Sequence, residues 1–101
     1  MDKHYGNQDC KTYEDFREVL ARPDIDAVLV TPPDHWHATA ALMTMKAGKA
    51  IYVEKPCSHN PREGELLVEA AAKHGAVFQM GNQRRSSTVY QSVIKEIRGG
   101  L

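Results

Sequence analysis

Glutamate, lysine and proline stand together at residues 54–56, directly after the apolar run 50–53. Because proline fixes the backbone angle φ near about −65°, the turn gives Lys55 a defined direction away from that run. Glu54 beside it can influence the charge and orientation of the lysine. A lysine held in this way can donate a hydrogen bond to a carbonyl or a hydroxyl group. A solvated lysine at the end of a strand is an equally good interpretation of these three residues taken alone.

Two histidines flank the only tryptophan, at His35, Trp36 and His37, shortly after the apolar run 26–31. Residues i and i+2 at the start of a helix do not share a face, so this spacing disfavours a metal site. We expect one imidazole and the indole to project from the start of the helix instead. The alternative is a partly buried aromatic cap with no ligand.

Residues 82–85 follow a third apolar run, 76–80, and end in Arg84 and Arg85. The guanidinium group presents forked donors, which suit a phosphate, a carboxylate or a polyol. We expect one of the two arginines to bind and the other to be solvated.

The pattern of apolar residues predicts the elements that carry these groups. Helices are expected over 12–23 with Thr12 as N-cap, over 34–48 with Asp34 as N-cap and Gly48 as terminator, over 60–75 with Asn60 as N-cap, and from Ser87 or Thr88 to Gly99. Strands are expected over 26–31, 50–53 and 76–80, with one further short strand around Cys10. The run 26–31 is β-branched and bounded by prolines, which predicts a strand buried on both faces.

Helices alternate with strands in this order, which is typical of an α/β fold with parallel strands and right-handed connections. The carboxyl ends of parallel strands lie along one edge of the sheet, where open α/β folds bind ligands. Spacing therefore gathers one rim of polar residues, which are His35, His37, Glu54, Lys55, Asn82, Gln83, Arg84 and Arg85.

Composition excludes several classes of protein. The 101 residues carry 13 basic and 13 acidic side chains and are 42% hydrophobic, as in one small globular domain without a nucleic-acid-binding footprint. No aliphatic stretch exceeds four residues, so we expect no membrane span and no secretory segment, and a soluble, by default cytoplasmic, chain. Cys10 and Cys57 form no C-x-x-C motif, which argues against a disulfide scaffold and a zinc site.

Three segments, residues 13–37, 50–56 and 76–85, resemble the NAD(P)-dependent oxidoreductases typified by glucose-fructose oxidoreductase, inositol dehydrogenase and the MocA proteins. Glu-Lys-Pro together with the preceding turn from Pro33 to His37 is the most specific part. The resemblance covers essentially the whole chain and implies a Rossmann-type domain, with a doubly wound parallel sheet and NAD or NADP as cofactor.

The resemblance also implies roles for single residues. Thr31, Pro32 and His37 would line the nicotinamide-ribose side of the dinucleotide, and Glu54 and Lys55 would stand where the nicotinamide meets the substrate. Lys55 would hydrogen-bond a hydroxyl of a sugar, polyol or related substrate and assist proton movement, while Arg85 would orient that substrate. The remaining residues expected at the cofactor are Trp36, Pro56 and Gln83.

The chain also departs from the family. It contains no G-x-G-x-x-G motif and no strand with the acidic residue that holds the adenine ribose. We therefore expect residues 1–101 to form an incomplete cofactor domain that lacks the first two strands and the substrate domain, and to be inactive alone. The alternative function is a non-catalytic binding or assembly module, which self-associates through the central strand edge that this arrangement leaves unpaired.

Overall fold

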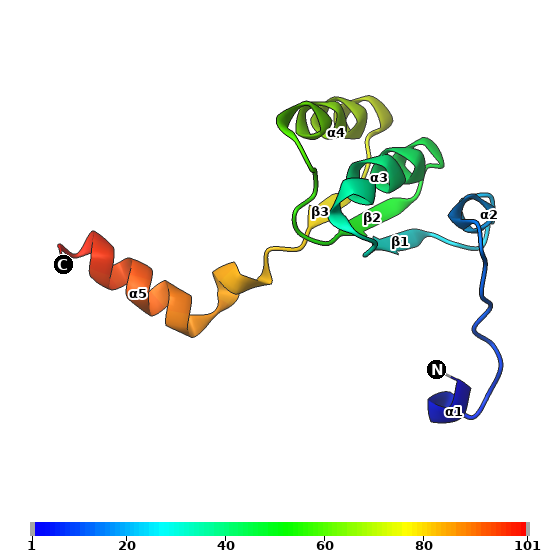
Figure 1. The fold of residues 1–101 in the computed structure, drawn as a ribbon, viewed down its shortest axis with the longest axis horizontal. Helices are drawn as coiled ribbons and strands as arrows, with labels where there is room; N and C mark the ends of the chain where they lie inside the picture. The colour runs from blue at the N-terminus through cyan, green and yellow to red at the C-terminus, as the bar shows by residue number, and fades with distance from the viewer. Residues whose placement is uncertain (1, 101) are drawn as a thin grey trace.

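The computed structural model describes residues 2–100 and places a three-stranded parallel sheet at the centre of the chain (Figure 1). The elements are α1 (Asp2–Tyr5), α2 (Phe16–Leu20), β1 (Ala27–Val30), the 3-10 turn η1 (Asp34–Trp36), α3 (His37–Lys46), β2 (Ala50–Val53), α4 (Pro61–His74), β3 (Phe78–Met80), the 3-10 turn η2 (Gln83–Ser86) and α5 (Thr88–Arg98). The strand order is β1-β2-β3, with Val30 opposite Val53 and Val53 opposite Met80. The predicted α/β class with parallel strands is confirmed.

Helix α4 begins and ends where the sequence predicts. The Asn60 side chain accepts a hydrogen bond from Glu63 N at 3.0 Å, and Pro61 occupies the first turn, where no backbone donor is required. The Glu63 carboxylate reaches back to accept from His59 N at 2.7 Å. Gly75 ends the helix with φ of 57°, a conformation that glycine adopts without steric cost.

Helix α3 buries Ala38, Ala41 and Met45, and the predicted terminator Gly48 follows it with φ of 72°. The prediction that Asp34 caps this helix through its side chain is wrong. Asp34 opens the turn η1, where Trp36 N donates to Pro33 O and no side chain forms a capping bond. This extra 3-10 turn moves the start of α3 to His37, three residues beyond Asp34.

The segment before β1 differs most from its prediction. Helix α2 is shorter than expected and its N-cap is Asp15 rather than Thr12, because the Asp15 carboxylate accepts from both the backbone N–H and the guanidinium of Arg17. The strand expected around Cys10 is absent from the described residues. The described strands β1, β2 and β3 pair only with one another, so this segment gains no ladder hydrogen bonds.

Helices α3 and α4 cover one face of the sheet (Figure 1). Val30, Ile51 and Val53 are buried beneath them, together with Leu67 of α4. In the described part of the chain no helix covers the opposite face, and Leu29 is 65% exposed. The prediction that strand 26–31 is buried on both faces is therefore wrong, and the strand is shorter, because side chains of a strand alternate between faces and only one face here has a helical layer.

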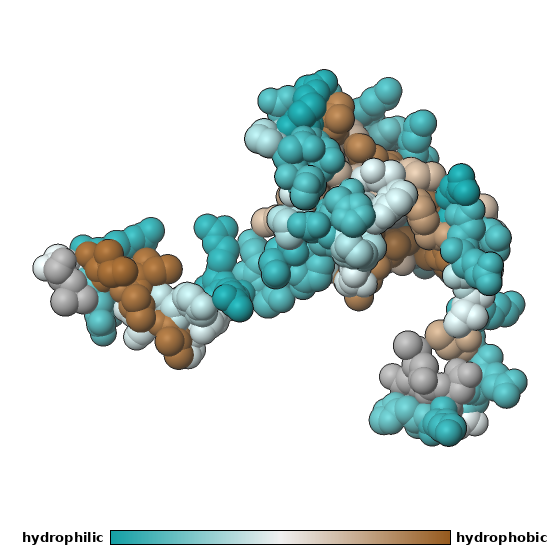
Figure 2. Space-filling view, viewed as in Figure 1, coloured by the Kyte–Doolittle hydropathy of each residue, from teal (hydrophilic) through white to brown (hydrophobic). Residues whose placement is uncertain are grey.

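Helix α5 extends away from the sheet at the end of the segment after β3 (Figure 1). The radius of gyration is accordingly 17.3 Å, against about 13 Å for a compact domain of roughly 100 residues. Ser87 precedes the helix as its N-cap but makes no side-chain capping bond. Figure 2 shows an apolar stripe along this helix, to which Val93 and Ile97 contribute as exposed residues.

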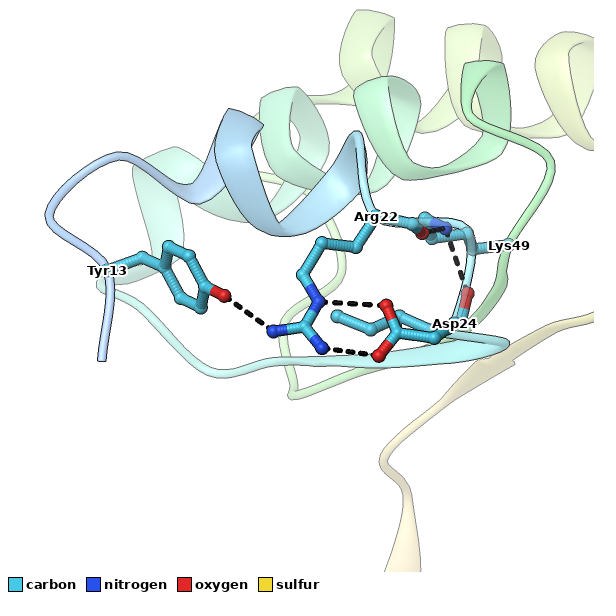
Figure 3. Close-up of polar contacts among 5 residues, drawn as sticks. Tyr13, Arg22, Asp24 and Lys49 are labelled. Carbon is cyan, nitrogen blue, oxygen red and sulfur yellow. Dashed lines mark hydrogen bonds and ion pairs between the residues drawn. The ribbon is translucent and has the colours of Figure 1, made fainter. Parts of the chain in front are cut away.

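The amino ends of β1 and β2 are joined by Lys49, which is buried. Its ammonium group donates to Arg22 O at 2.6 Å and to Ile25 O at 2.8 Å (Figure 3). Arg22 in turn binds the Asp24 carboxylate, which lowers the pKa of Asp24 to about 2, and donates to the hydroxyl of Tyr13. This network fixes the corner between α2 and β1, at the end of the sheet away from the predicted rim.

Among residues 2–100, no helix combines the length and the apolar character required to cross a membrane.

Candidate functional site

The turn after β2 is held by the side chain of Glu54. One carboxylate oxygen accepts from Lys55 N at 2.7 Å, and the other accepts from the side-chain amide of Gln83 at 3.3 Å. The bond from Lys55 N–H is the largest cause of a Glu54 pKa below its usual value of 4.5, followed by the bond from Gln83. Since Glu54 N also donates to Val30 O at 2.9 Å, this residue joins the carboxyl ends of all three strands.

Gly81 makes room for this arrangement. A Cβ atom at Gly81 would lie 3.0 Å from the Tyr52 hydroxyl and 3.2 Å from a Glu54 carboxylate oxygen, closer than ordinary contacts allow. Gly81 N donates to Val53 O at 2.8 Å, which keeps the turn after β3 against β2. No role was assigned to Gly81 or Tyr52 from the sequence. A glycine immediately after a predicted strand could have indicated Gly81, because such a glycine allows a neighbouring group to approach the backbone closely.

His37 joins the turns after β1 and β2. This residue is only 3% exposed, with Nδ1 of its ring 2.5 Å from Pro56 O and Nε2 2.8 Å from Pro32 O. Both partners are carbonyl oxygens, so a neutral ring donates to one of them at a time and a doubly protonated ring donates to both. His37 therefore fixes the backbone of two turns, whereas His35 is exposed and lies 3.8 Å from the Asp34 carboxylate.

A groove of about 470 Å³ runs along β1, between α2 and the start of α3. We call it the β1 groove. Its walls are largely apolar, and its lining includes Phe16, Leu29, Thr31, Pro32, Trp36 and Ala40. The indole of Trp36 is 49% exposed. The groove thus offers a flat aromatic surface and one hydroxyl at the carboxyl end of β1.

A second hollow, of about 370 Å³, lies at the carboxyl end of β3. We call it the β3 pocket, and its lining is Lys55, Met80, Gly81, Asn82, Gln83, Arg84 and Arg85. The peptide bond between Lys55 and Pro56 is cis. The pocket brings a lysine from one turn together with two arginines and two amides from another, although these turns are about 30 residues apart in sequence.

The residues predicted for a site are therefore divided between two hollows. Thr31, Pro32 and Trp36 line the β1 groove. Lys55, Gln83 and Arg85 line the β3 pocket. His37, Glu54 and Pro56 stand between the turns as hydrogen-bond partners, and His35 lines neither hollow. Within residues 2–100, no group of three or more His, Cys, Asp or Glu side chains is placed to hold a metal ion.

Comparison with known proteins gives a match to one family. The family model described as "Oxidoreductase family, NAD-binding Rossmann fold" matches residues 4–82, which include both turns joined by His37 and the whole three-stranded sheet.

Individual relatives are similar over most of this chain. The chain is 34% identical to 4-carboxy-2-hydroxymuconate-6-semialdehyde dehydrogenase of Sphingobium, and the match covers 95% of this chain and 30% of that relative. It is 33% identical to scyllo-inositol 2-dehydrogenase (NAD(+)) of Bacillus subtilis, and that match covers 89% of this chain and 26% of the relative. The crystal structure of apo scyllo-inositol dehydrogenase from Lactobacillus casei superposes with a TM-score of 0.71 at 30% identity, over 86% of this chain and 26% of that one. The chain spans less than a third of the length of these relatives.

Proposed function

Because this chain belongs to the oxidoreductase family with an NAD-binding Rossmann fold, we propose that residues 1–101 are an incomplete cofactor domain of an NAD- or NADP-dependent oxidoreductase. The sheet and its helices are part of that Rossmann fold. The proposed reaction interconverts a hydroxyl and a carbonyl group on a sugar, a polyol or a related compound. The names of the relatives include a carboxylated semialdehyde and an inositol, so the family does not fix the charge of the substrate.

The β1 groove suits the nicotinamide-ribose half of a dinucleotide. A planar ring can stack on the exposed indole of Trp36 against an apolar wall, and the Thr31 hydroxyl can hydrogen-bond a ribose or a carboxamide. The residues present therefore fit the nicotinamide-ribose half of the dinucleotide. The sequence contains no glycine-rich loop, which is the usual binding site of the pyrophosphate. His37 contributes by holding the Pro32 turn that lines the groove.

Lys55 is the residue to which we assign the proton chemistry. When bound, the nicotinamide supplies the hydride transfer. The amine of Lys55 hydrogen-bonds the substrate hydroxyl. It accepts the hydroxyl proton when the hydroxyl is oxidised to a carbonyl, and returns a proton to that oxygen in the reverse reaction. Glu54 fixes the backbone of Lys55 through the 2.7 Å hydrogen bond, and Pro56 O lies 2.5 Å from Nδ1 of the buried His37, so both sides of the lysine have a packed neighbour.

Arg85 and Gln83 line the same pocket as Lys55 and are proposed to orient the substrate. The Gln83 amide is held by Glu54, which leaves its carbonyl oxygen able to accept from a hydroxyl. The observation that carries the whole proposal is the position of Lys55. It lies two residues after the end of β2, the central strand, and lines a polar hollow at the carboxyl edge where α/β folds bind ligands.

Fluorescence of Trp36 provides the test, since it is the only tryptophan. The purified chain is titrated separately with NADH, with reduced nicotinamide mononucleotide and with AMP. The first two contain the nicotinamide half and should quench the indole in a saturable way, whereas AMP contains only the adenine half and should not.

Circular dichroism on the same samples checks that the chain is folded. The matched control is Tyr90→Phe, because Tyr90 lies on α5 outside the β1 groove, and its quenching should equal that of the wild type. A folded chain that shows no quenching with either nicotinamide compound would contradict the proposed cofactor site. Equal quenching by AMP and by the mononucleotide would contradict the assignment of the nicotinamide half to this groove.

A second candidate function is assembly through the free edge of β1. Within residues 2–100 no strand pairs with that edge, and Leu29 exposes an apolar side chain beside it. An edge strand with unpaired backbone groups is a template for another strand, and a second copy of this chain would supply one. Both chains would then bury part of the β1 groove.

Sedimentation over a wide concentration range distinguishes this alternative. Association through β1 predicts a mass that rises with concentration in the wild type and stays monomeric in Leu29→Lys, with Val68→Lys on α4 as the exposed control. A mass that is independent of concentration would argue against assembly.

A further inference from the structure

We propose that the β3 pocket binds an oxyanion group of the substrate, a carboxylate or a phosphate, and that the substrate is therefore an anionic hydroxy compound rather than a neutral polyol. This inference rests on the proposed function, because it assigns the substrate class to the pocket that contains Lys55. It is carried by the charges that line the pocket.

Three cationic side chains line the β3 pocket, Lys55, Arg84 and Arg85, and no Asp or Glu lines it. None of the three forms an ion pair with a carboxylate among residues 2–100. Among the described residues, the guanidinium of Arg84 donates to the neutral hydroxyl of Tyr90, at 3.4 Å. The pocket therefore concentrates positive charge that the described part of the chain does not neutralise.

Glu54 is the carboxylate that approaches this region, and its oxygens are engaged elsewhere. One accepts from Lys55 N and the other from the Gln83 amide. These bonds hold the carboxylate in the turn, where it orders the backbone rather than pairing with an arginine. The charge of Glu54 reduces the local positive potential but leaves the guanidinium groups of Arg84 and Arg85 without a carboxylate partner among residues 2–100, so both can bind an anionic ligand.

The surrounding chain has the same sign of charge. Residues 82–101 contain four basic side chains and one acidic side chain, Glu96. Arg85 also lines a neighbouring hollow on α5 together with Lys95 and Arg98. A cluster of one sign with a concave surface attracts ligands of the opposite sign and raises their local concentration.

The pocket lining also matches the shape of such a ligand. Two adjacent guanidinium groups offer forked donors to the oxygens of a carboxylate or a phosphate. Asn82 and Gln83 lie beside them and can bond hydroxyl groups along a carbon chain. The oxyanion would thus occupy the arginine side of the pocket and a hydroxyl would face Lys55, which points to a sugar acid, a hydroxy acid or a sugar phosphate.

The test uses three six-carbon probes that share a polyol chain or ring. The isotope-labelled 101-residue chain is titrated, without cofactor, with D-gluconate, with D-glucose 6-phosphate and with neutral D-glucitol, and the amide resonances of residues 81–87 are followed. We expect at least one anionic probe to bind about tenfold or more tightly than glucitol, and added salt to weaken that probe only. The two anions distinguish a carboxylate ligand from a phosphate ligand.

Variants assign the effect to the pocket. Arg84→Gln combined with Arg85→Gln should remove the preference for the anion, while Arg62→Gln on α4 changes the net charge elsewhere and should leave it unchanged. Both arginines are exposed, and circular dichroism confirms folding of each variant. Equal affinity for glucitol and both anions, or an unchanged preference in the double variant, would overturn the inference.

The outcome is independent of the Trp36 titration. Anion binding at residues 81–87 with no quenching by the nicotinamide compounds would retain the oxyanion pocket and refute the cofactor site. Quenching without any preference for the anions would retain the cofactor site and refute the oxyanion pocket.

Discussion

Replacing His37 by phenylalanine should destabilise the protein strongly. The ring at this position is buried and lies within hydrogen-bond distance of Pro32 O and Pro56 O, at 2.8 and 2.5 Å. Phenylalanine fills a similar volume but has no ring N–H, so the carbonyl oxygen that accepts from the neutral histidine ring loses its donor. An unsatisfied buried acceptor costs about 1–3 kcal/mol, and these two contacts are partly buried, so we expect the free energy of unfolding to fall by about 1–3 kcal/mol.

Urea unfolding, followed by circular dichroism and by Trp36 fluorescence, measures this loss. His37→Gln keeps a donor that can satisfy one of the carbonyl groups, so it should lose about half as much and remains measurable if the phenylalanine variant is unfolded. His35→Gln is the matched control, because His35 is exposed, and should stay within about 0.5 kcal/mol of the wild type.

The same variant tests the link between this histidine and the β1 groove. His37 holds the Pro32 turn, so His37→Gln should weaken quenching by reduced nicotinamide mononucleotide even where the chain is fully folded. A His37→Phe protein whose free energy of unfolding lies within about 0.5 kcal/mol of the wild type would refute the reasoning, since a partly buried carbonyl group would then have lost its donor without cost.

Three further changes test other parts of the structure. Lys49→Met keeps the apolar stem but removes the donor to Arg22 O and Ile25 O, and should cost about 2 kcal/mol in urea unfolding. Leu67→Ala removes a core side chain that is 4% exposed and should cost about 3 kcal/mol, whereas Val68→Ala, at 71% exposed, should cost less than about 0.5 kcal/mol. The pKa of Glu54 is lowered in the folded protein, so its contribution to stability is present above the usual value of 4.5 and is lost as the pH falls through the lowered pKa. The stability difference between wild type and Glu54→Gln, measured by urea midpoints, should therefore shrink from about pH 6 to about pH 3, and a constant difference would contradict the assigned cause.

Local signals in the sequence were sufficient to predict α4. Its cap at Asn60, the proline at the first helical position and the glycine after its end all act within one helical turn of the boundary they set. The edge position of Lys55 and Arg85 was also predictable, because parallel strands place their carboxyl ends together whatever the details of packing.

Features that depend on distant parts of the chain were not predictable in the same way. The exposure of Leu29 depends on which face of the sheet the helices cover. The β-branched residues beside Leu29 favour a strand but do not indicate which of its faces is covered. The start of α2 shifted from Thr12 to Asp15 because two residues compete for the same role and the Asp15 carboxylate also binds a guanidinium group. The partners of His37 are backbone carbonyls, one of which is 19 residues away. Every residue has a backbone carbonyl, so the sequence does not indicate which one a histidine will contact.

The central position of β2 gives the two walls of the β3 pocket different mechanical properties. This strand is paired on both sides, so its amide protons should exchange with solvent more slowly than those of β1 and β3, and Lys55 follows it by two residues. Arg84 and Arg85 instead precede α5, which extends away from the sheet (Figure 1). We therefore expect the lysine side of the pocket to be stiff and the arginine side to be compliant, so that ligands of different length can be accommodated while the reacting hydroxyl keeps one position.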